Sequence, residues 1–199
     1  SYEMEEQYLQ KMFDLRVDAI ILMGGKSDQL VTDLEYVDLL DRITDTTPII
    51  TTGKIEGSLC YQVCIDEMAS VDLAMEHSFF AWPSAYCTDR DGKNHIRSTY
   101  DKRMRYRMLL RKNGITYRER YVTDSDYNIE GGYQCMEKLF QENRTMPTAV
   151  IAINDFSAIG ILRCIEEHHL SVPQDISLVS FDGTFLSDIV NPEAYQRLL

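Results

Sequence analysis

The chain has 199 residues, of which 44% are hydrophobic and 26% charged, and its 32 acidic and 20 basic side chains give a formal net charge of −12 at pH 7. DNA binding depends on Lys and Arg side chains that neutralise phosphates, so this acidic balance argues against DNA contact by this chain itself. No apolar run approaches the roughly 18 residues of a membrane helix. The first residues also lack the charged-then-apolar order of a signal peptide, so we expect a cytoplasmic protein.

Short apolar runs alternate with amphipathic stretches along almost the whole chain. This alternation is typical of a mostly parallel sheet flanked by helices, and it predicts an α/β fold. The expected strands cover residues 18–23, 48–52, 85–88, 118–122, 149–153 and 176–181. The expected helices cover residues 2–15, 29–43, 67–80, 99–112 and 129–141, with one more between the last two strands.

The alternation falls into two similar blocks, which predicts two subdomains. The first covers residues 1–81, and Trp82-Pro83 breaks the pattern where we place the crossover to a second subdomain at residues 82–183. Residues 184–199 are expected to return toward the first subdomain. Because a doubly wound sheet begins on a strand and this chain begins on a helix, we expect further parts of the fold to lie outside both ends.

The stretch at residues 148–183 is the most informative, because two buried strands joined by one amphipathic helix each end in polar residues. Asn154 ends the first strand and Asp182 the second. Ligands of open α/β sheets bind outside the carboxyl ends of the strands, so this amide and this carboxylate are candidates for holding a small polar molecule. The alternatives are that Asn154 caps the following helix and that Asp182-Gly183 forms a turn.

Motifs for nucleotide binding and catalysis are incomplete. The segment Gly24-Gly25-Lys26-Ser27 follows a strand like the end of a phosphate-binding loop, but Ile20 occupies the place of its first glycine. Gly131-Gly132 does not extend to a dinucleotide fingerprint, and no serine lies in a nucleophile elbow. We therefore expect neither an enzyme nor a bound cofactor.

Metal binding is also not expected. The five cysteines form no CxxC pair, which favours reduced thiols in the core. His168 and His169 are adjacent, and adjacent helical residues point about 100° apart, so both are poorly placed to bind one ion.

Several segments, in this order, carry a family resemblance. They are VDAIIL at 17–22, PII at 48–50, the turn at Asp66, NGI at 113–115, Asp126-Tyr127 with EGGY at 130–133, PTAVIAINDFSAIGILR at 147–163 and VPQDISLVSFDG at 172–183. Together they resemble the effector-binding core of bacterial transcription regulators of the lac repressor (LacI/GalR) family. The resemblance covers nearly the whole chain, and the last two segments are its most specific part.

The resemblance implies two Rossmann-like subdomains with mostly parallel sheets, the type I periplasmic-binding-protein-like fold. Such subdomains close on a small effector, usually a sugar or a related metabolite. The resemblance also implies a homodimer that binds operator DNA only through a helix-turn-helix headpiece, which would precede this segment. Ligand binding would then control DNA binding allosterically by a population shift.

The family's cleft residues can be carried over by position. They fall on Asn154, Asp182, Tyr127, Lys102 and Ser98, and we add Phe181, Asp66 and Lys54 as further candidates. Tyr127 is expected as an aromatic platform, with ordinary core packing as its alternative. The family usually has Arg where this chain has Lys102, so either Lys102 acts as a point charge or Arg103 takes that role.

The leading hypothesis is therefore the ligand-sensing domain of a LacI-family regulator. The first alternative is the solute-binding protein of a sugar transporter, against which the missing signal peptide and the cysteines argue. The second is an α/β enzyme, for which Asp66 and Asp182 are the one acid/base pair worth considering.

Overall fold

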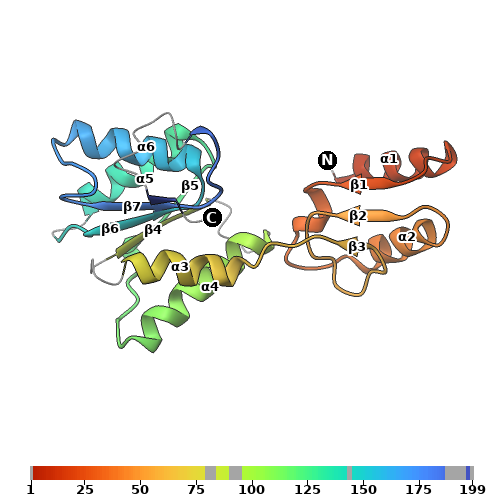
Figure 1. The fold of residues 1–199 in the computed structure, drawn as a ribbon, viewed down its shortest axis with the longest axis horizontal. Helices are drawn as coiled ribbons and strands as arrows, with labels where there is room; N and C mark the ends of the chain where they lie inside the picture. Colours follow the sequence, from red (N-terminus) through yellow and green to blue (C-terminus); the bar gives the residue numbers. More distant parts are fainter. Residues whose placement is uncertain (1, 79–83, 90–95, 143–144, 187–195, 198–199) are drawn as a thin grey trace. The chain divides into compact units, whose positions relative to one another are not determined.

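The computed structural model describes residues 2–78, 84–89, 96–142, 145–186 and 196–197 (Figure 1). Contacts between Cα atoms divide the chain into two compact units. Unit 1 comprises Ser1–Asp66 and Asn94–Ser98, and unit 2 comprises Glu67–Lys93 and Thr99–Leu199. Each unit carries its own parallel sheet with its own helices, which confirms the α/β fold class expected from the alternating pattern.

Unit 1 is built on a three-stranded parallel sheet. Its strands lie in the order β1 (Ile20–Leu22), β2 (Ile49–Thr51) and β3 (Tyr61–Gln62), and its helices are α1 (Tyr2–Asp14) and α2 (Leu34–Thr44). The short strand β3 lies in a stretch for which the sequence predicted no regular structure.

The core of unit 1 lies where α1 and α2 meet the sheet. Leu9 of α1 and Leu40 of α2 share one buried cluster with Ile20 and Ile49 of the strands. Neighbouring side chains of a strand point to opposite faces, and Ile21 accordingly has 65% of its surface exposed. Among the described residues, the helices of unit 1 therefore cover the sheet on the face of Ile20, and Ile21 is exposed on the opposite face.

Helix α2 begins later than the periodicity predicted. Residues Gly25–Asp28 form a 3₁₀ turn, and the Asp33 side chain accepts hydrogen bonds from the backbone N–H groups of Glu35 and Tyr36. A carboxylate that satisfies these amides fixes the start of a helix, so Leu34 and not residue 29 is its first residue.

Unit 2 is built on a five-stranded, wholly parallel sheet in the order β5-β4-β6-β7-β8. The strands are β4 (Ser84–Asp89), β5 (Val122–Ser125), β6 (Ala149–Ala152), β7 (Ser177–Ser180) and β8 (Gln196–Arg197). The helices are α3 (Glu67–Ser78), α4 (Arg97–Lys112), α5 (Ile129–Glu142) and α6 (Asp155–Glu167). Figure 1 shows α5 and α6 on one side of this sheet and α3 and α4 on the other.

Both faces of the unit 2 sheet are buried by these helices. Val150 and Leu178 pack into the cluster beneath α5 and α6, whereas Ile151 and Val179 pack into the cluster beneath α3 and α4. The unbroken apolar sequence of β6 follows from this two-sided burial. Within the described part of the chain, no helix combines the length and the apolar character that crossing a membrane requires.

Helices α5 and α6 cross with their backbones in close contact. A Cβ atom on Gly160 would overlap the carbonyl oxygen of Ile129 and lie 2.6 Å from the nitrogen of Tyr133, and one on Gly132 would overlap the carbonyl oxygen of Ser157. Any residue other than glycine would place a Cβ atom where these backbone atoms already lie. The two glycines therefore determine how closely the two helices approach.

One expected strand differs from the structure. The strand predicted at residues 118–122 begins at Val122, and a 3₁₀ turn occupies Glu119–Tyr121. Tyr121 is buried, and its hydroxyl group donates to the Thr145 carbonyl oxygen at 2.9 Å, so a tertiary contact determines the local backbone. The predicted crossover at Trp82-Pro83 lies outside the described residues.

Helix α3 precedes the predicted subdomain boundary but packs in unit 2. The boundary after residue 81 stays a prediction. Residues 196 and 197 pair with β7, so at that point the chain is still in unit 2.

The cysteines agree only in part with the expectation of reduced core thiols. Cys60 and Cys164 are free and buried, and Cys64 is free but exposed. The expectation of a reduced thiol is wrong for Cys135, which is disulfide-bonded.

Candidate ligand-binding site

The carboxyl ends of three parallel strands of unit 2 are followed by predicted site residues. Strands β5, β6 and β7 belong to one parallel sheet and therefore end at the same edge. Tyr127 follows β5, Asn154 follows β6, and Asp182 follows β7. The fold thus brings these three side chains, which are separate in the sequence, to the edge where open α/β sheets bind ligands.

Lys102 is a buried cation in the same unit. Its ammonium group lies 2.7 Å from a carboxylate oxygen of Glu67 and 4.9 Å from the centre of the Phe181 ring. Both Lys102 and Phe181 are buried, with 8% and 5% of their surfaces exposed. A buried ammonium group needs such partners, because an isolated charge away from water costs several kcal/mol or more.

Arg103, the alternative to Lys102, has different neighbours. Its guanidinium group lies 3.0 Å from Glu119 and 3.8 Å from Asp124, at the side of the 3₁₀ turn and the end of β5. Lys102, and not Arg103, is therefore the basic side chain beside Phe181.

Asp182 lies on the loop after β7, in a backbone conformation with φ = 87° that few residues other than glycine, Asn and Asp adopt. Desolvation by the surrounding atoms raises the pKa of its carboxyl group, and the nearby charges of Asp155 and Glu67 raise it further, while Lys102 opposes the rise. The pKa of Asp182 thus depends on the Lys102–Glu67 pair.

Asp155 anchors the loop that bears Asp182. This aspartate has 2% of its surface exposed, and it accepts hydrogen bonds from the Ser180 hydroxyl at 2.5 Å and from the Thr184 backbone N–H at 2.6 Å and hydroxyl at 2.7 Å. Ser180 precedes Asp182 and Thr184 follows it, so the buried carboxylate holds both sides of the loop. In the sequence, Asp155 indicated a charge favourable to the helix dipole or a cap of the following helix.

Asn154 has a structural role in the first turn of α6. Its side-chain oxygen accepts from the Ser157 backbone N–H at 2.8 Å, which makes it the N-cap that the sequence left open as an alternative. Its side-chain nitrogen donates to the Tyr127 carbonyl oxygen at 3.3 Å. Asn154 therefore joins the loop after β5 to the start of α6, and its role toward a ligand stays a prediction.

Aromatic side chains are exposed after each of these three strands. Tyr127 has 38% of its surface exposed after β5, Phe156 48% after β6, and Phe185 70% after β7. The Tyr127 hydroxyl group is hydrogen-bonded to Thr99, so this ring is held in place and is not part of the core. Of these three rings, only Tyr127 was an expected site residue, and that expectation came from the family resemblance.

The remaining predicted residues belong to unit 1. Lys54 is exposed and forms a surface ion pair with Glu56 at 3.5 Å, and Asp66 is an exposed residue directly before α3. Ser98 is partly buried in the first turn of α4. Their part in a ligand site stays a prediction.

The incomplete phosphate-binding loop in unit 1 has a structural explanation. The Lys26 ammonium group is paired with Glu6 and with Asp33, the latter at 2.8 Å, and it lies 4.7 Å from the centre of the Tyr36 ring. Lys26 is therefore part of the internal packing of unit 1.

The unit 2 edge combines groups that suit a polyhydroxylated molecule. Carboxylates accept hydrogen bonds from hydroxyl groups, an ammonium group donates to their oxygens, and aromatic rings pack against apolar faces of small ligands. Domains of the parallel α/β fold place their small-molecule sites at this edge of the sheet.

Comparison with known proteins agrees with this class. Residues 84–194 match the family model of the periplasmic binding protein-like domain. The chain is 30% identical over 196 residues to catabolite control protein A of Priestia megaterium, and the alignment covers 95% of this chain and 55% of the relative. It is 34% identical over 172 residues to the HTH-type transcriptional regulator GalR of Streptococcus thermophilus, and the alignment covers 84% of this chain and 47% of the relative.

A solved structure shows the same fold. It is a sugar-binding transcriptional regulator of the LacI family from Escherichia coli, complexed with phosphate, which aligns with a TM-score of 0.81 and 22% identity over 98% of this chain and 68% of that chain. The chain belongs to the periplasmic binding protein-like domain family, and the relatives and the solved structure named here are transcriptional regulators. It spans about half the length of the curated relatives it matches.

Proposed function

We propose that this chain is the effector-sensing core of a transcriptional regulator and that it binds a sugar or a related polyol metabolite at the unit 2 edge. The observation that carries the proposal is the grouping of Asp182, the Lys102–Glu67 pair and the exposed aromatic rings at the carboxyl ends of one parallel sheet. This position is the one at which open α/β sheets bind their ligands.

The chemistry of this edge supports a polyol over an apolar ligand. Asp182 is exposed at this edge, so its carboxylate can accept hydrogen bonds from the hydroxyl groups of a ligand. The exposed ring of Tyr127 is held by Thr99 and offers a flat apolar surface for the face of a sugar ring.

The regulatory part of the proposal follows the family. Effector binding would shift the population between two arrangements of the protein, and a helix-turn-helix headpiece elsewhere in the regulator would contact operator DNA. The net charge of −12 is consistent with DNA contact by the headpiece and not by this chain, because an acidic surface repels DNA phosphates.

The test is a binding screen on the chain. Sugars, sugar phosphates, nucleosides and purines are tested by thermal shift, in which a ligand at 100 times its Kd stabilises the protein by about 2.7 kcal/mol. For the best ligand, Asp182→Ala is expected to raise the Kd about 10- to 150-fold in calorimetry, which corresponds to the loss of one charge-assisted hydrogen bond of about 1.5–3 kcal/mol.

The matched control is Asp38→Asn, at an exposed position in α2 of unit 1. This substitution is expected to leave the Kd unchanged. An unchanged Kd in the Asp182 variant would refute the assignment of the site. Steady chemical turnover of the bound ligand would refute the proposal of a sensor and favour an enzyme.

We also propose that the regulator is a homodimer that uses the exposed side of α1. Met4, Tyr8 and Met12 lie four residues apart on this helix with 48%, 54% and 39% of their surfaces exposed, and they line a hollow of about 310 Å³. Such contiguous apolar surface on a soluble domain favours an interface.

Tyr8→Glu is therefore expected to shift the chain from dimer to monomer at micromolar concentration, as measured by light scattering after size exclusion. Gln10→Glu adds the same charge at a neighbouring exposed position of α1 and is the control, which should remain dimeric. A monomeric parent chain, or a dimer that withstands Tyr8→Glu, would contradict the use of α1.

A further inference from the structure

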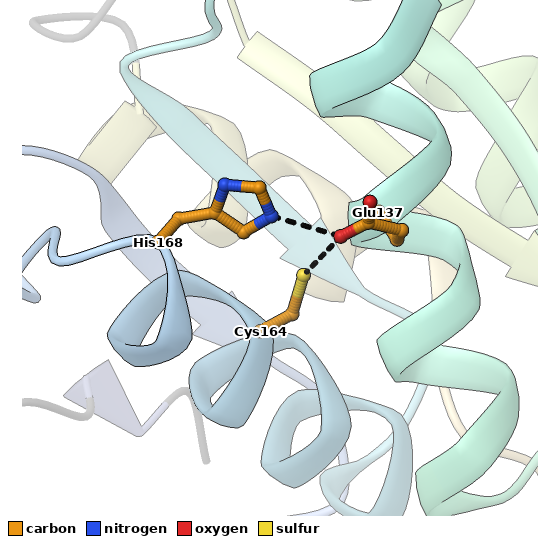
Figure 2. A group of neighbouring side chains, drawn as sticks. All are labelled: Glu137, Cys164 and His168. Atoms are coloured by element: carbon orange, nitrogen blue, oxygen red, sulfur yellow. Dashed lines mark hydrogen bonds and ion pairs between the residues drawn. The ribbon is translucent and has the colours of Figure 1, made fainter.

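A cluster of three metal-ligand side chains lies between α5 and the C-terminal end of α6 (Figure 2). Cys164 and His168 are four residues apart on the last turns of α6, and Glu137 faces them from α5. The His168 Nε2 atom lies 2.8 Å from Glu137 Oε2, and the Cys164 Sγ atom lies 3.6 Å from the same oxygen. The three ligand atoms all lie within 4.8 Å of one another.

These distances suit a small transition-metal ion. Zinc takes nitrogen, oxygen and sulfur ligands at about 2.0 to 2.3 Å in a tetrahedron, which places neighbouring ligand atoms about 3.3 to 3.7 Å apart. The sulfur–oxygen separation already has this value, and the nitrogen–oxygen pair has to open by about half an ångström from hydrogen-bond distance. We propose that Glu137, Cys164 and His168 bind a zinc ion, with solvent at the fourth position.

Neighbouring residues orient two of the three ligands. The Gln141 side-chain nitrogen donates to Glu137 Oε1 at 3.0 Å, which leaves Oε2 directed at His168 and Cys164. The His168 ring stacks on Phe140, with ring centres 3.9 Å apart and an angle of 16° between the planes. Outer contacts of this kind commonly contribute 10- to 100-fold to metal affinity.

Burial and charge are consistent with entry of an ion from solvent. The Cys164 side chain is buried, whereas those of Glu137 and His168 are 32% and 38% exposed. Burial and the neighbouring Glu137 raise the pKa of the Cys164 thiol to about 12, so the thiol carries its proton in the metal-free protein. When zinc binds, the S–H bond breaks, the sulfur donates its electron pair to the ion, and the proton goes to solvent.

The sequence argued against a metal because His168 and His169 diverge, and that geometric argument still applies to the pair. The partners of His168 are instead Cys164 one turn earlier and Glu137 on another helix. The site lies at the opposite end of α6 from Asn154, about 20 Å away along a helix of 13 residues, so it is separate from the proposed effector site. The two proposals can therefore fail independently.

The experiment uses cobalt(II) as the spectroscopic probe in a Cys64→Ser background, which removes the exposed free thiol. One cobalt per chain is expected, with a thiolate-to-cobalt charge-transfer band and the visible bands of tetrahedral cobalt, both abolished by added zinc. His168→Gln and Glu137→Gln are expected to weaken binding at least tenfold, and both change partly exposed side chains.

His169→Gln is the matched control, because it removes an exposed imidazole next to the site but outside it. Its cobalt affinity should equal that of the background protein. Absence of a thiolate band in the folded background protein would overturn the proposal. The same holds if His168→Gln binds as tightly as the background, or if His169→Gln weakens binding equally.

Discussion

Replacing Gly160 by alanine is expected to lower the free energy of unfolding of unit 2 by about 2 kcal/mol. Alanine favours an isolated helix over glycine by about 1 kcal/mol, and this gain opposes the loss. However, the new methyl group would overlap the Ile129 carbonyl oxygen and crowd the Tyr133 nitrogen, both backbone atoms of α5 that no rotamer change can move. Overpacking of this kind costs roughly 1 to 3 kcal/mol or more, and the helices have to separate.

Urea denaturation followed by circular dichroism measures this loss. Glu166→Ala is the control, since it introduces the same side chain at an exposed position of the same helix and should change stability by no more than about 0.5 kcal/mol. A Gly160 variant as stable as the parent would show that α5 and α6 do not cross as closely as described.

Replacing Lys102 by methionine is expected to destabilise unit 2 by about 3 to 5 kcal/mol, the usual cost of leaving one member of a buried ion pair without its partner. Only 10% of the Lys102 side chain and 19% of the Glu67 side chain are exposed, so solvent does little to compensate Glu67. Methionine keeps the length and the contact with Phe181, which restricts the change to the charge.

A double-mutant cycle separates this effect from general damage. Lys102→Met combined with Glu67→Leu removes both charges and is expected to recover most of the lost stability, while effector affinity stays low. Lys54→Met is the control, because its pair with Glu56 is 57% exposed on both sides and such surface pairs contribute about 0 to 1 kcal/mol. Equal losses in the Lys102 and Lys54 variants would refute the role of burial.

Much of the fold could be predicted from the sequence, because burial leaves a local pattern. The unbroken apolar run at Ala149–Ala152 indicated a strand covered on both faces, and every one of its residues is buried. The start of α2 and the position of β5 were wrong for the opposite reason. They depend on the Asp33 cap with its Lys26 partner and on the Tyr121 contact with Thr145, and no local periodicity encodes these.

The residues of the candidate site were likewise predicted from the sequence only in part. The strand-end positions of Asn154 and Asp182 followed from the βαβ pattern. Glu67 and Asp155, in contrast, contribute to the site through tertiary contacts: Glu67 pairs with the buried Lys102, and Asp155 is itself buried. The sequence does not indicate whether an acidic residue at the start of a helix is buried. Phe156 was missed because its apolar side chain fitted the core-facing pattern of α6, whereas the structure leaves 48% of it exposed.

Unit 1 is completed by a segment that is synthesised late. The Arg97 guanidinium group donates to the Leu30 carbonyl oxygen, 67 residues earlier, and pairs with Glu56, while Ile96 bridges to Gln29. At about 5 to 20 residues per second, a ribosome makes the two ends of this contact several seconds apart. The loops of unit 1 at Leu30 and Glu56 therefore lack their contacts with Arg97 until β4 and the start of α4 have been synthesised. A stalled or shortened chain that ends before Arg97 is expected to be cleaved by proteases at these two loops.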